Sequence, residues 1–188
     1  AMLEDVRELD QLIDEMLDYA RMESNAIQLN FEDVVVTELL QNLVEKLQML
    51  PGPAILLQQP TRCTASIDAH YLERAIQNLL VNAKRYGKNQ VVLTLQASSD
   101  ELVIQVEDDG SGIPLHQREA ILQPFVRLDE SRSKGRGGFG LGLAIVSRIV
   151  SWHQGQIAID TSPLGGARFS IRLPLQRTIS SKPDVLTR

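Results

Sequence analysis

The sequence predicts an α+β fold, a two-layer α/β sandwich with helices on one face of a mixed sheet, preceded by one long N-terminal helix. Three observations predict this fold class. Segments with apolar residues at helical spacing follow one another along the chain, separated by short segments in which apolar and polar residues alternate. Two pairs of adjacent strand-like segments are joined by short turns, as in antiparallel hairpins. The first residues carry only the helical pattern, so they form a helix outside the sandwich.

Composition narrows the class of protein. The chain has 188 residues, of which 43% are hydrophobic and 23% charged, as in soluble globular proteins with one well-formed core. A net charge of −5 argues against a nucleic-acid binder, which would carry a basic surface. Cys63 is the single cysteine, so no disulfide can form within the chain. No apolar run reaches the roughly 18 residues of a membrane span, and no signal peptide is visible. We expect this part of the protein to contact neither nucleic acid nor membrane.

The N-terminal helix has an apolar stripe with alternating spacings of four and three. The stripe consists of Met2, Val6, Leu9, Ile13, Met16 and Ala20. It fits a helix of a coiled coil or bundle, and it fits an ordinary amphipathic helix packed on its own domain nearly as well. The pattern is lost after Met22, so we place a domain boundary near Ser24. The predicted division is a partial helical domain at 1–24, a globular domain at 25–175 and a polar tail at 176–188.

The remaining elements follow in order. We expect a strand at 27–31, where Ile27, Leu29 and Phe31 alternate, and a helix from about Thr37 that ends before Pro51. Strands are expected at 55–58 and 63–67, then a helix at 69–86 with Asp68 as its N-cap. Further predictions are a hairpin at 91–96 and 102–107, a short helix at 115–122, a helix from 143 to about 155, and a hairpin at 156–160 and 168–173.

The stretch 137–145 places glycines at 138, 140 and 142 directly before a helical pattern. Glycine allows positive φ and close approach of a ligand, and a helix N-terminus offers unpaired N–H groups and a positive dipole end. Together they suggest a cradle for phosphates. A flexible loop that leads into a core helix explains the same residues, because a glycine-rich loop alone is a weak signal.

The helix 69–86 carries a second, polar face formed by Arg74, Asn78, Asn82 and Arg85. Asparagine is a poor helix former, so two of them one turn apart within a helix require an explanation. Their amide oxygens are suited to Mg²⁺, which keeps several waters and relies on substrate phosphates. A solvated polar face is the alternative.

Asp108 continues the apolar face of the strand 102–107, where an unpaired carboxylate would be costly. A ligand donor such as the exocyclic amine of adenine would satisfy it, and Gly110 and Gly112 would allow a flat base to approach the backbone. Asp109-Gly110 could also form a hairpin turn, but no returning strand follows it.

The segment 125–138 has no periodicity and is locally basic, with Arg127, Arg132, Lys134 and Arg136. It fits a mobile lid over a polyphosphate, or a solvated surface loop. Other chemistries lack their motifs. No Walker-type phosphate loop is present, and the three histidines with one cysteine give no zinc-ligand spacing. Gly135, Gly137 and Gly140 match the dinucleotide pattern, but a basic loop rather than a strand precedes them.

Four motifs in a fixed order resemble those of sensor histidine kinases of two-component systems. Residues 78–86 resemble the asparagine box, 108–113 the first glycine box, 122–129 the phenylalanine box and 138–145 the second glycine box. Residues 9–21 are similar to the second helix of the dimerisation and histidine-phosphotransfer domain. The resemblance covers nearly the whole chain and implies a Bergerat-type sandwich that binds ATP and Mg²⁺.

The resemblance also implies roles for individual residues. Asn78 and Asn82 would serve the metal and phosphates, Arg85 the phosphates, Tyr86 the base and Asp108 the adenine amine. Phe125 and Arg127 open the lid, and Arg127 would stabilise charge on the transferring phosphoryl group. We expect Asn78, Asn82 and Arg127 to be catalytic. The other expected nucleotide-binding residues are Arg85, Tyr86, Asp108, Gly110, Gly112, Ile113, Phe125, Gly138, Gly140, Leu141, Gly142 and Leu143.

The chain departs from the family pattern in three places. It has no phosphoacceptor box of the His-Glu-Leu-Arg-Thr-Pro kind, so we expect the accepting histidine to lie outside it and the chain not to phosphorylate itself. Phe139 stands where a small or hydroxyl residue is commoner, and Ala167 where threonine is usual.

Two alternatives to a kinase are a nucleotide-dependent interaction module and an ATP-hydrolysing relative of the gyrase or chaperone type. The hydrolysing relatives carry a glutamate at the position of Asn78, and an amide cannot act as their general base. The expected partners of a kinase are its own phosphoacceptor helix, a response regulator and a second copy in the full-length protein. We expect a cytoplasmic location, in a parent protein of the bacterial inner membrane.

Overall fold

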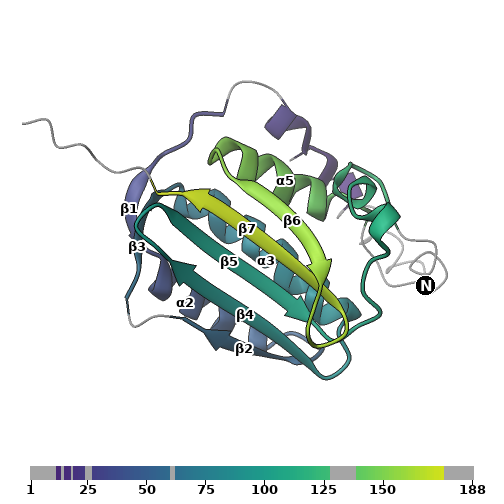
Figure 1. Ribbon diagram of the computed structural model, residues 1–188. Helices are drawn as coiled ribbons and strands as arrows, with labels where there is room; N and C mark the ends of the chain where they lie inside the picture. The colour runs from purple at the N-terminus through teal and green to yellow at the C-terminus, as the bar shows by residue number, and fades with distance from the viewer. Residues whose placement is uncertain are drawn as a thin grey trace, which may run out of the picture.

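The computed structural model describes residues 12–13, 15–17, 19–23, 27–59, 62–127 and 139–175. Its strands are β1 (Glu32–Val35), β2 (Ala54–Gln58), β3 (Thr64–Ile67), β4 (Gln90–Ala97), β5 (Glu101–Asp108), β6 (Gln156–Thr161) and β7 (Ala167–Pro174). Its labelled α-helices are α2 (Val36–Gln48), α3 (Ala69–Tyr86) and α5 (Gly142–Trp152). These helices lie together on one face of the larger sheet (Figure 1). The predicted two-layer sandwich is confirmed.

The larger sheet is mixed and has the order β2-β4-β5-β7-β6. Its first pair, β2 and β4, is parallel, with Ile55 opposite Val91, and the other neighbours are antiparallel. The chain between β2 and β4 contains β3 and α3, because parallel strands need a crossover connection. Both predicted hairpins form, β4 with β5 and β6 with β7. The strands β1 and β3 make a separate two-stranded antiparallel sheet.

The core lies between the helices and the larger sheet. The helices contribute apolar side chains at spacings of three and four, and the strands contribute alternate residues, as each period requires. Burying one such side chain stabilises the fold by about 1.5–3 kcal/mol. Fully buried residues include Leu40, Leu43, Leu72, Ile76, Leu79, Leu93, Ile104, Val106, Phe169 and Ile171.

Asp68 caps α3 as predicted and also joins α3 to the end of α5. Its Oδ1 accepts from the Tyr71 N–H at 3.1 Å, and its Oδ2 accepts from the Asn30 N–H at 2.8 Å. The Asp68 N–H donates to Nε2 of buried His153 at 3.1 Å, while the opposite ring nitrogen lies 2.8 Å from the Ile149 carbonyl. Since Nε2 accepts, Nδ1 carries the proton and donates. These bonds fix the direction of α3, and with it the position of its far end.

The strand predicted at 27–31 does not form. The structure places β1 directly after this segment, at Glu32–Val35, where it pairs with β3. A strand needs a partner ladder, and the backbone N–H of Asn30 is instead bonded to the Asp68 side chain. The alternation arises because Ile27 packs on the core and Phe31 stacks edge-on against His153, with ring centroids 5.2 Å apart.

The short helix predicted at 115–122 is also absent as one element. Two 3₁₀ turns, η1 (Leu115–Gln117) and η2 (Ala120–Leu122), take its place. The N–H groups of Gln117, Arg118 and Leu122 bond three residues back rather than four. Leu115 is 79% exposed, so no continuous apolar face stabilises an α-helix here.

The described residues between 12 and 23 are helical, as predicted. Ile13, Met16 and Leu17 remain about half exposed, whereas Met22 is buried in the domain core. Glu23 lies 3.8 Å from the Arg148 guanidinium of α5. The end of this helix therefore packs on the sandwich before the boundary proposed at Ser24. Met2, Val6 and Leu9 lie outside the described residues. No helix in the described part of the chain combines the length and apolarity that a membrane crossing requires.

Candidate functional site

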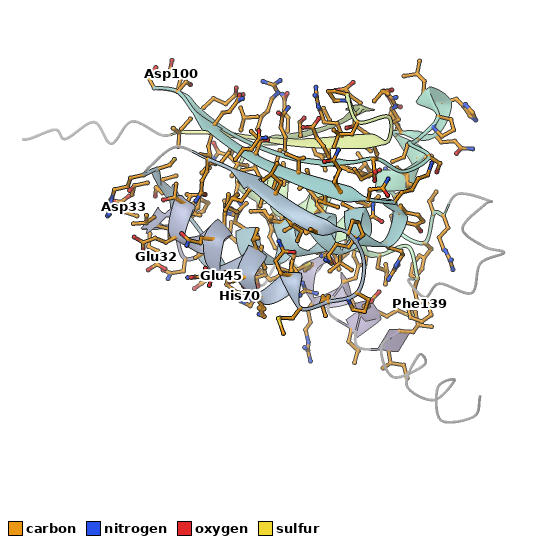
Figure 2. All side chains as sticks on the ribbon, turned by 90° about the horizontal axis from the view of Figure 1, so that it is seen from below. Glu32, Asp33, Glu45, His70, Asp100 and Phe139 are labelled. Carbon is orange, nitrogen blue, oxygen red and sulfur yellow. The ribbon has the colours of Figure 1, made fainter. Side chains whose placement is uncertain are left out.

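A cavity of about 510 Å³ opens at the end of the sandwich where α3 and β5 end and α5 begins. Figure 2 labels Phe139, one of its lining residues, at the opposite end of the molecule from Asp100 in the β4–β5 turn. The volume lies in the range of small-molecule and cofactor sites. Its lining residues are Glu15, Asn78, Val81, Asn82, Arg85, Tyr86, Gly87, Lys88, Asp108, Ser111, Gly112, Ile113, Ile121, Val126, Arg127, Phe139, Gly140, Gly142, Leu143 and Ala167.

Asp108 is the buried carboxylate of this cavity, with 3% of its surface exposed. It ends β5 on the face that carries Leu102, Ile104 and Val106, as period two requires. Its Oδ1 accepts from the N–H groups of Gly110 at 2.8 Å and Ala167 at 3.2 Å. Burial raises the pKa of Asp108, and these two hydrogen bonds oppose the rise. Both bonds use Oδ1, which leaves Oδ2 as the oxygen suited to accept from a ligand N–H donor.

Gly110 and Gly112 shape the loop after Asp108 in different ways. Gly112 lines the cavity with a φ of +73°, a conformation that favours glycine. Gly110 does not line it. A β-carbon on Gly110 would collide with the Tyr86 carbonyl and lie 2.9 Å from Asp108 Oδ1. Position 110 therefore requires glycine because the backbone at the end of α3 packs against it, not because a base approaches it.

The polar face of α3 opens into the cavity through Asn78, Asn82, Arg85 and the half-exposed Tyr86. Successive turns of α3 position these side chains in a row from the start of α5 to the end of β5. Arg74, which the sequence places on the same face, does not line the cavity. Asn78, Asn82 and Arg85 therefore line a concave site rather than a flat stretch of surface.

The start of α5 forms the opposite wall through Gly142 and Leu143. In the part of the chain that the structure describes, no side chain caps this helix, in contrast to α3, so its first N–H groups can donate to a ligand. Unpaired N–H groups and the positive end of the helix dipole favour an anion at this wall.

Gly140 and Phe125 are hydrogen-bonded to each other across the segment that lies between them in the chain. The Phe125 N–H donates to the Gly140 carbonyl at 2.9 Å. Both residues have positive φ, +79° at Gly140 and +67° at Phe125, which is rare for a bulky residue. Residues 128–138, which carry most of the predicted basic lid, lie outside the described residues.

The structure brings most of the predicted nucleotide-binding residues to one cavity. Those that line it are Asn78, Asn82, Arg85, Tyr86, Asp108, Gly112, Ile113, Arg127, Gly140, Gly142 and Leu143. Gly110 and Phe125 support the walls from outside, and Leu141 is fully buried in the core. Gly138 lies outside the described residues.

Several residues near the cavity are not among the predicted site residues. Glu15 enters the lining from the N-terminal helix, and Ala167 supports Asp108 through its N–H. Asp109 accepts from the chain that follows α3. Arg118 donates from Nε to the Ile113 carbonyl at 3.1 Å and from Nη1 to the Ile159 carbonyl at 3.2 Å, which ties the cavity loop to β6. Only the pairing of distant segments reveals these roles.

The side chains that could bind a metal in this cavity can be compared with the ligands that Mg²⁺ prefers. Among the described residues, no group of three or more His, Cys, Asp or Glu is arranged to hold a metal ion. The amide oxygens of Asn78 and Asn82 are hard oxygen donors in the same cavity as Arg85. This set fits Mg²⁺ delivered with phosphate oxygens, and it does not fit zinc, which needs nitrogen or sulfur ligands.

Comparisons with known proteins agree with this geometry. Residues 67–177 match the family described as histidine kinase-, DNA gyrase B-, and HSP90-like ATPase. The sensor protein RstB of Escherichia coli K12 is 40% identical over 182 residues, which is 95% of this chain and 42% of that protein. The sensor histidine kinase CpxA of the same strain is 39% identical over 127 residues, 68% of this chain and 26% of that protein. The chain thus spans less than half the length of these relatives.

Solved structures of histidine kinases are also similar to this chain. Full-length ShkA in complex with AMPPNP superposes with a TM-score of 0.77 at 27% identity, over 92% of this chain and 37% of that one. The histidine kinase domain of the Escherichia coli osmosensor EnvZ gives 0.62 at 32% identity, over 82% of this chain and 94% of that one. The predicted resemblance to sensor histidine kinases is confirmed, and the chain belongs to the histidine kinase-, DNA gyrase B- and HSP90-like ATPase family.

Proposed function

We propose that this chain is the catalytic part of a two-component sensor histidine kinase, which binds Mg-ATP and transfers its γ-phosphoryl group to a histidine outside the chain. The observation that carries the proposal is that Asn78, Asn82 and the buried Asp108 open into one cavity of about 510 Å³. Its relative ShkA was solved with AMPPNP, a triphosphate nucleotide analogue.

The base would lie at the Asp108 end of the cavity. Asp108 would accept from the adenine amine, and Tyr86 and Ile113 would contact the faces of the ring. Arg85, Asn82 and the first N–H groups of α5 would hold the phosphates. Mg²⁺ held by Asn78 and Asn82 would supply neutralising charge on the phosphate oxygens. Arg127 would stabilise the negative charge that develops on the transferred group.

Asn78 favours transfer to a protein over hydrolysis. An amide cannot accept a proton from water, so the cavity lacks a general base at this position. The acceptor would be the histidine helix of the parent kinase, with relay to a response regulator. We propose that the parent is a homodimer of the inner membrane with this part on the cytoplasmic side, on the basis of its RstB and CpxA relatives.

The test is phosphorylation in trans. The chain is mixed with γ-labelled ATP, Mg²⁺ and the separately expressed histidine-bearing domain of its parent kinase. We expect acid-labile label on the partner, none on the chain itself, and loss of transfer in Asn82→Ala. ATP binding without transfer would favour an interaction module, and steady release of phosphate would favour an ATPase. Absence of ATP binding would overturn the proposal. Asn78→Glu should raise ATP hydrolysis, and an unchanged rate would remove the argument from Asn78.

A further inference from the structure

The N–H donors of the short connection between α3 and β4 bond to a single carboxylate, that of Asp109. Asp109 Oδ1 accepts from the Lys88 N–H at 2.7 Å, and Oδ2 accepts from the Asn89 N–H at 3.0 Å and from the Asn89 side-chain amide at 2.9 Å. The Gln90 N–H lies 3.5 Å from Oδ1. These donors, the Lys88 N–H foremost, lower the pKa of Asp109 to about 2. The carboxylate is therefore ionised wherever nucleotide binding is measured.

This connection forms a wall of the cavity. Tyr86, Gly87 and Lys88 all line it, and so does Asp108, the residue before Asp109. The chain leaves α3 abruptly, because Gly87 is already extended, with φ −65° and ψ 155°. Lys88 and Asn89 are exposed, so apolar burial contributes little to their position. Hydrogen bonds to Asp109 hold this wall in place.

From this juxtaposition we propose that Asp109 is a positioning residue for the nucleotide base: its carboxylate holds Lys88 and Asn89 against the end of β5, so that Tyr86 and Gly87 stand opposite Asp108. The inference rests on the proposed function, since it assigns the base to this end of the cavity. Asn82 and Asn78 lie about one and two turns before Tyr86 in α3, where helical hydrogen bonds position them independently of Asp109.

The consequence is a selective loss of base recognition. When the Asp109 carboxylate is removed, the Tyr86–Lys88 wall can move away from Asp108. Asn78 and Asn82, at the end of the cavity proposed for the phosphates, keep their geometry. Displacing a positioning group by on the order of 1 Å is enough to weaken a site severely. We expect Asp109→Ala to raise the Kd for ADP by about tenfold and to leave the Kd for inorganic pyrophosphate, which shares the diphosphate but has no base, nearly unchanged.

Calorimetric titration of the whole chain with Mg-ADP and with Mg-pyrophosphate tests this. Asp109→Asn keeps acceptor oxygen but no charge, so it should recover part of the ADP affinity. Ser98→Ala is the matched control, because Ser98 accepts the N–H groups of Asp100 and Glu101 in the β4–β5 turn, at the far end of the sheet. It should lower stability without changing either Kd. Urea unfolding of each variant supplies the stability comparison.

The outcomes separate this inference from the function on which it rests. If the unchanged chain binds no ADP, the proposed function fails and this inference fails with it. If the unchanged chain binds ADP and Asp109→Ala binds it equally well, only the role of Asp109 is overturned. An equal loss for ADP and pyrophosphate would also overturn it, since that result indicates general damage to the cavity.

Discussion

The side-chain oxygen of Asn78 lies 3.5 Å from the position that a β-carbon on Gly142 would occupy. The polar face of α3 and the first residue of α5 therefore meet at the phosphate end of the cavity. A single methyl group fits at this distance, but a branched side chain extends further toward the Asn78 amide. We therefore expect the size of residue 142 to control whether Asn78 can present its oxygen to the proposed Mg²⁺.

Gly142 gives the first prediction as a matched pair. Gly142→Ala should bind Mg-ATP within about twofold of the unchanged chain, whereas Gly142→Val should bind at least about tenfold more weakly, roughly 1.4 kcal/mol. Alanine and valine are both tolerated at the first turn of a helix, so the thermal unfolding temperature should change little in either variant. Equal affinities of the two variants in calorimetric titration would contradict the proposed place of Asn78 in the site.

Gly140 tests the connection to Phe125. A β-carbon at Gly140 would lie 2.9 Å from the Phe125 carbonyl carbon and from the Val126 oxygen, both backbone atoms that cannot move aside. Gly140→Ala should lower the free energy of unfolding by about 2–4 kcal/mol through positive φ and collision together. Gly165→Ala is the control, because its φ is +101° but nothing lies within 4 Å, so only about 1 kcal/mol should be lost. Urea unfolding measures the free energy of unfolding of both variants. Equal losses would exclude a contribution from the collision at Gly140.

Asp108 gives a prediction on pH. Burial raises the pKa of Asp108 in the folded state, so the folded protein binds this proton more tightly than the unfolded chain does. The ionised carboxylate therefore costs stability, and this cost grows as pH rises from the unfolded pKa of about 3.9 to the folded pKa, then stays constant. Asp108→Asn keeps an oxygen to accept from Gly110 and Ala167 without the charge.

We expect Asp108→Asn to be at least as stable as the unchanged chain at pH 7, with the difference fading below the unfolded pKa. Its affinity for Mg-ADP should fall, because an amide presents a donor as well as an acceptor to the adenine amine. Urea unfolding at several pH values and calorimetric titration measure the two effects. A variant destabilised more at pH 7 than at acid pH would show that the charge stabilises the fold.

Glu15 gives a prediction on nucleotide affinity. It lines the cavity from the N-terminal helix; burial raises its pKa, and attraction to Arg85 and Arg74 partly opposes the rise. Its charge repels the phosphates that would bind at Arg85. Glu15→Gln should therefore increase Mg-ATP affinity by about threefold at low ionic strength, with a smaller gain at high salt.

The control for Glu15 is Glu23→Gln. Glu23 belongs to the same helix and lies near Arg148, outside the cavity. Calorimetric titration should detect no gain in this variant. A gain of the same size in both variants would attribute the effect to release of the helix rather than to the charge of Glu15.

Local patterns predicted many of the elements but failed where a side chain had another reason to be apolar. The helix predicted at 69–86 forms over these residues, and Asp68 caps its start as predicted. Alternation at 27–31 predicted a strand, yet Ile27 and Phe31 pack on the core and on His153 without a partner strand. Apolar residues at 115–122 predicted a helix, but Leu115 points to solvent and the segment forms two 3₁₀ turns.

The sequence by itself determined the residue types of the site and the elements that carry them: two asparagines one turn apart, a carboxylate that ends an apolar strand face, and glycines before a helix. These are short-range patterns, and short-range sterics and hydrogen bonding specify them. Only the tertiary structure decided that Gly142 lies against Asn78, that Ala167 supports Asp108, that Asp109 holds the chain after α3, and that Glu15 enters the cavity. Each of these joins segments far apart in the chain. Sheet order and helix packing bring them together, because burial of the common core rather than any local pattern selects those pairings.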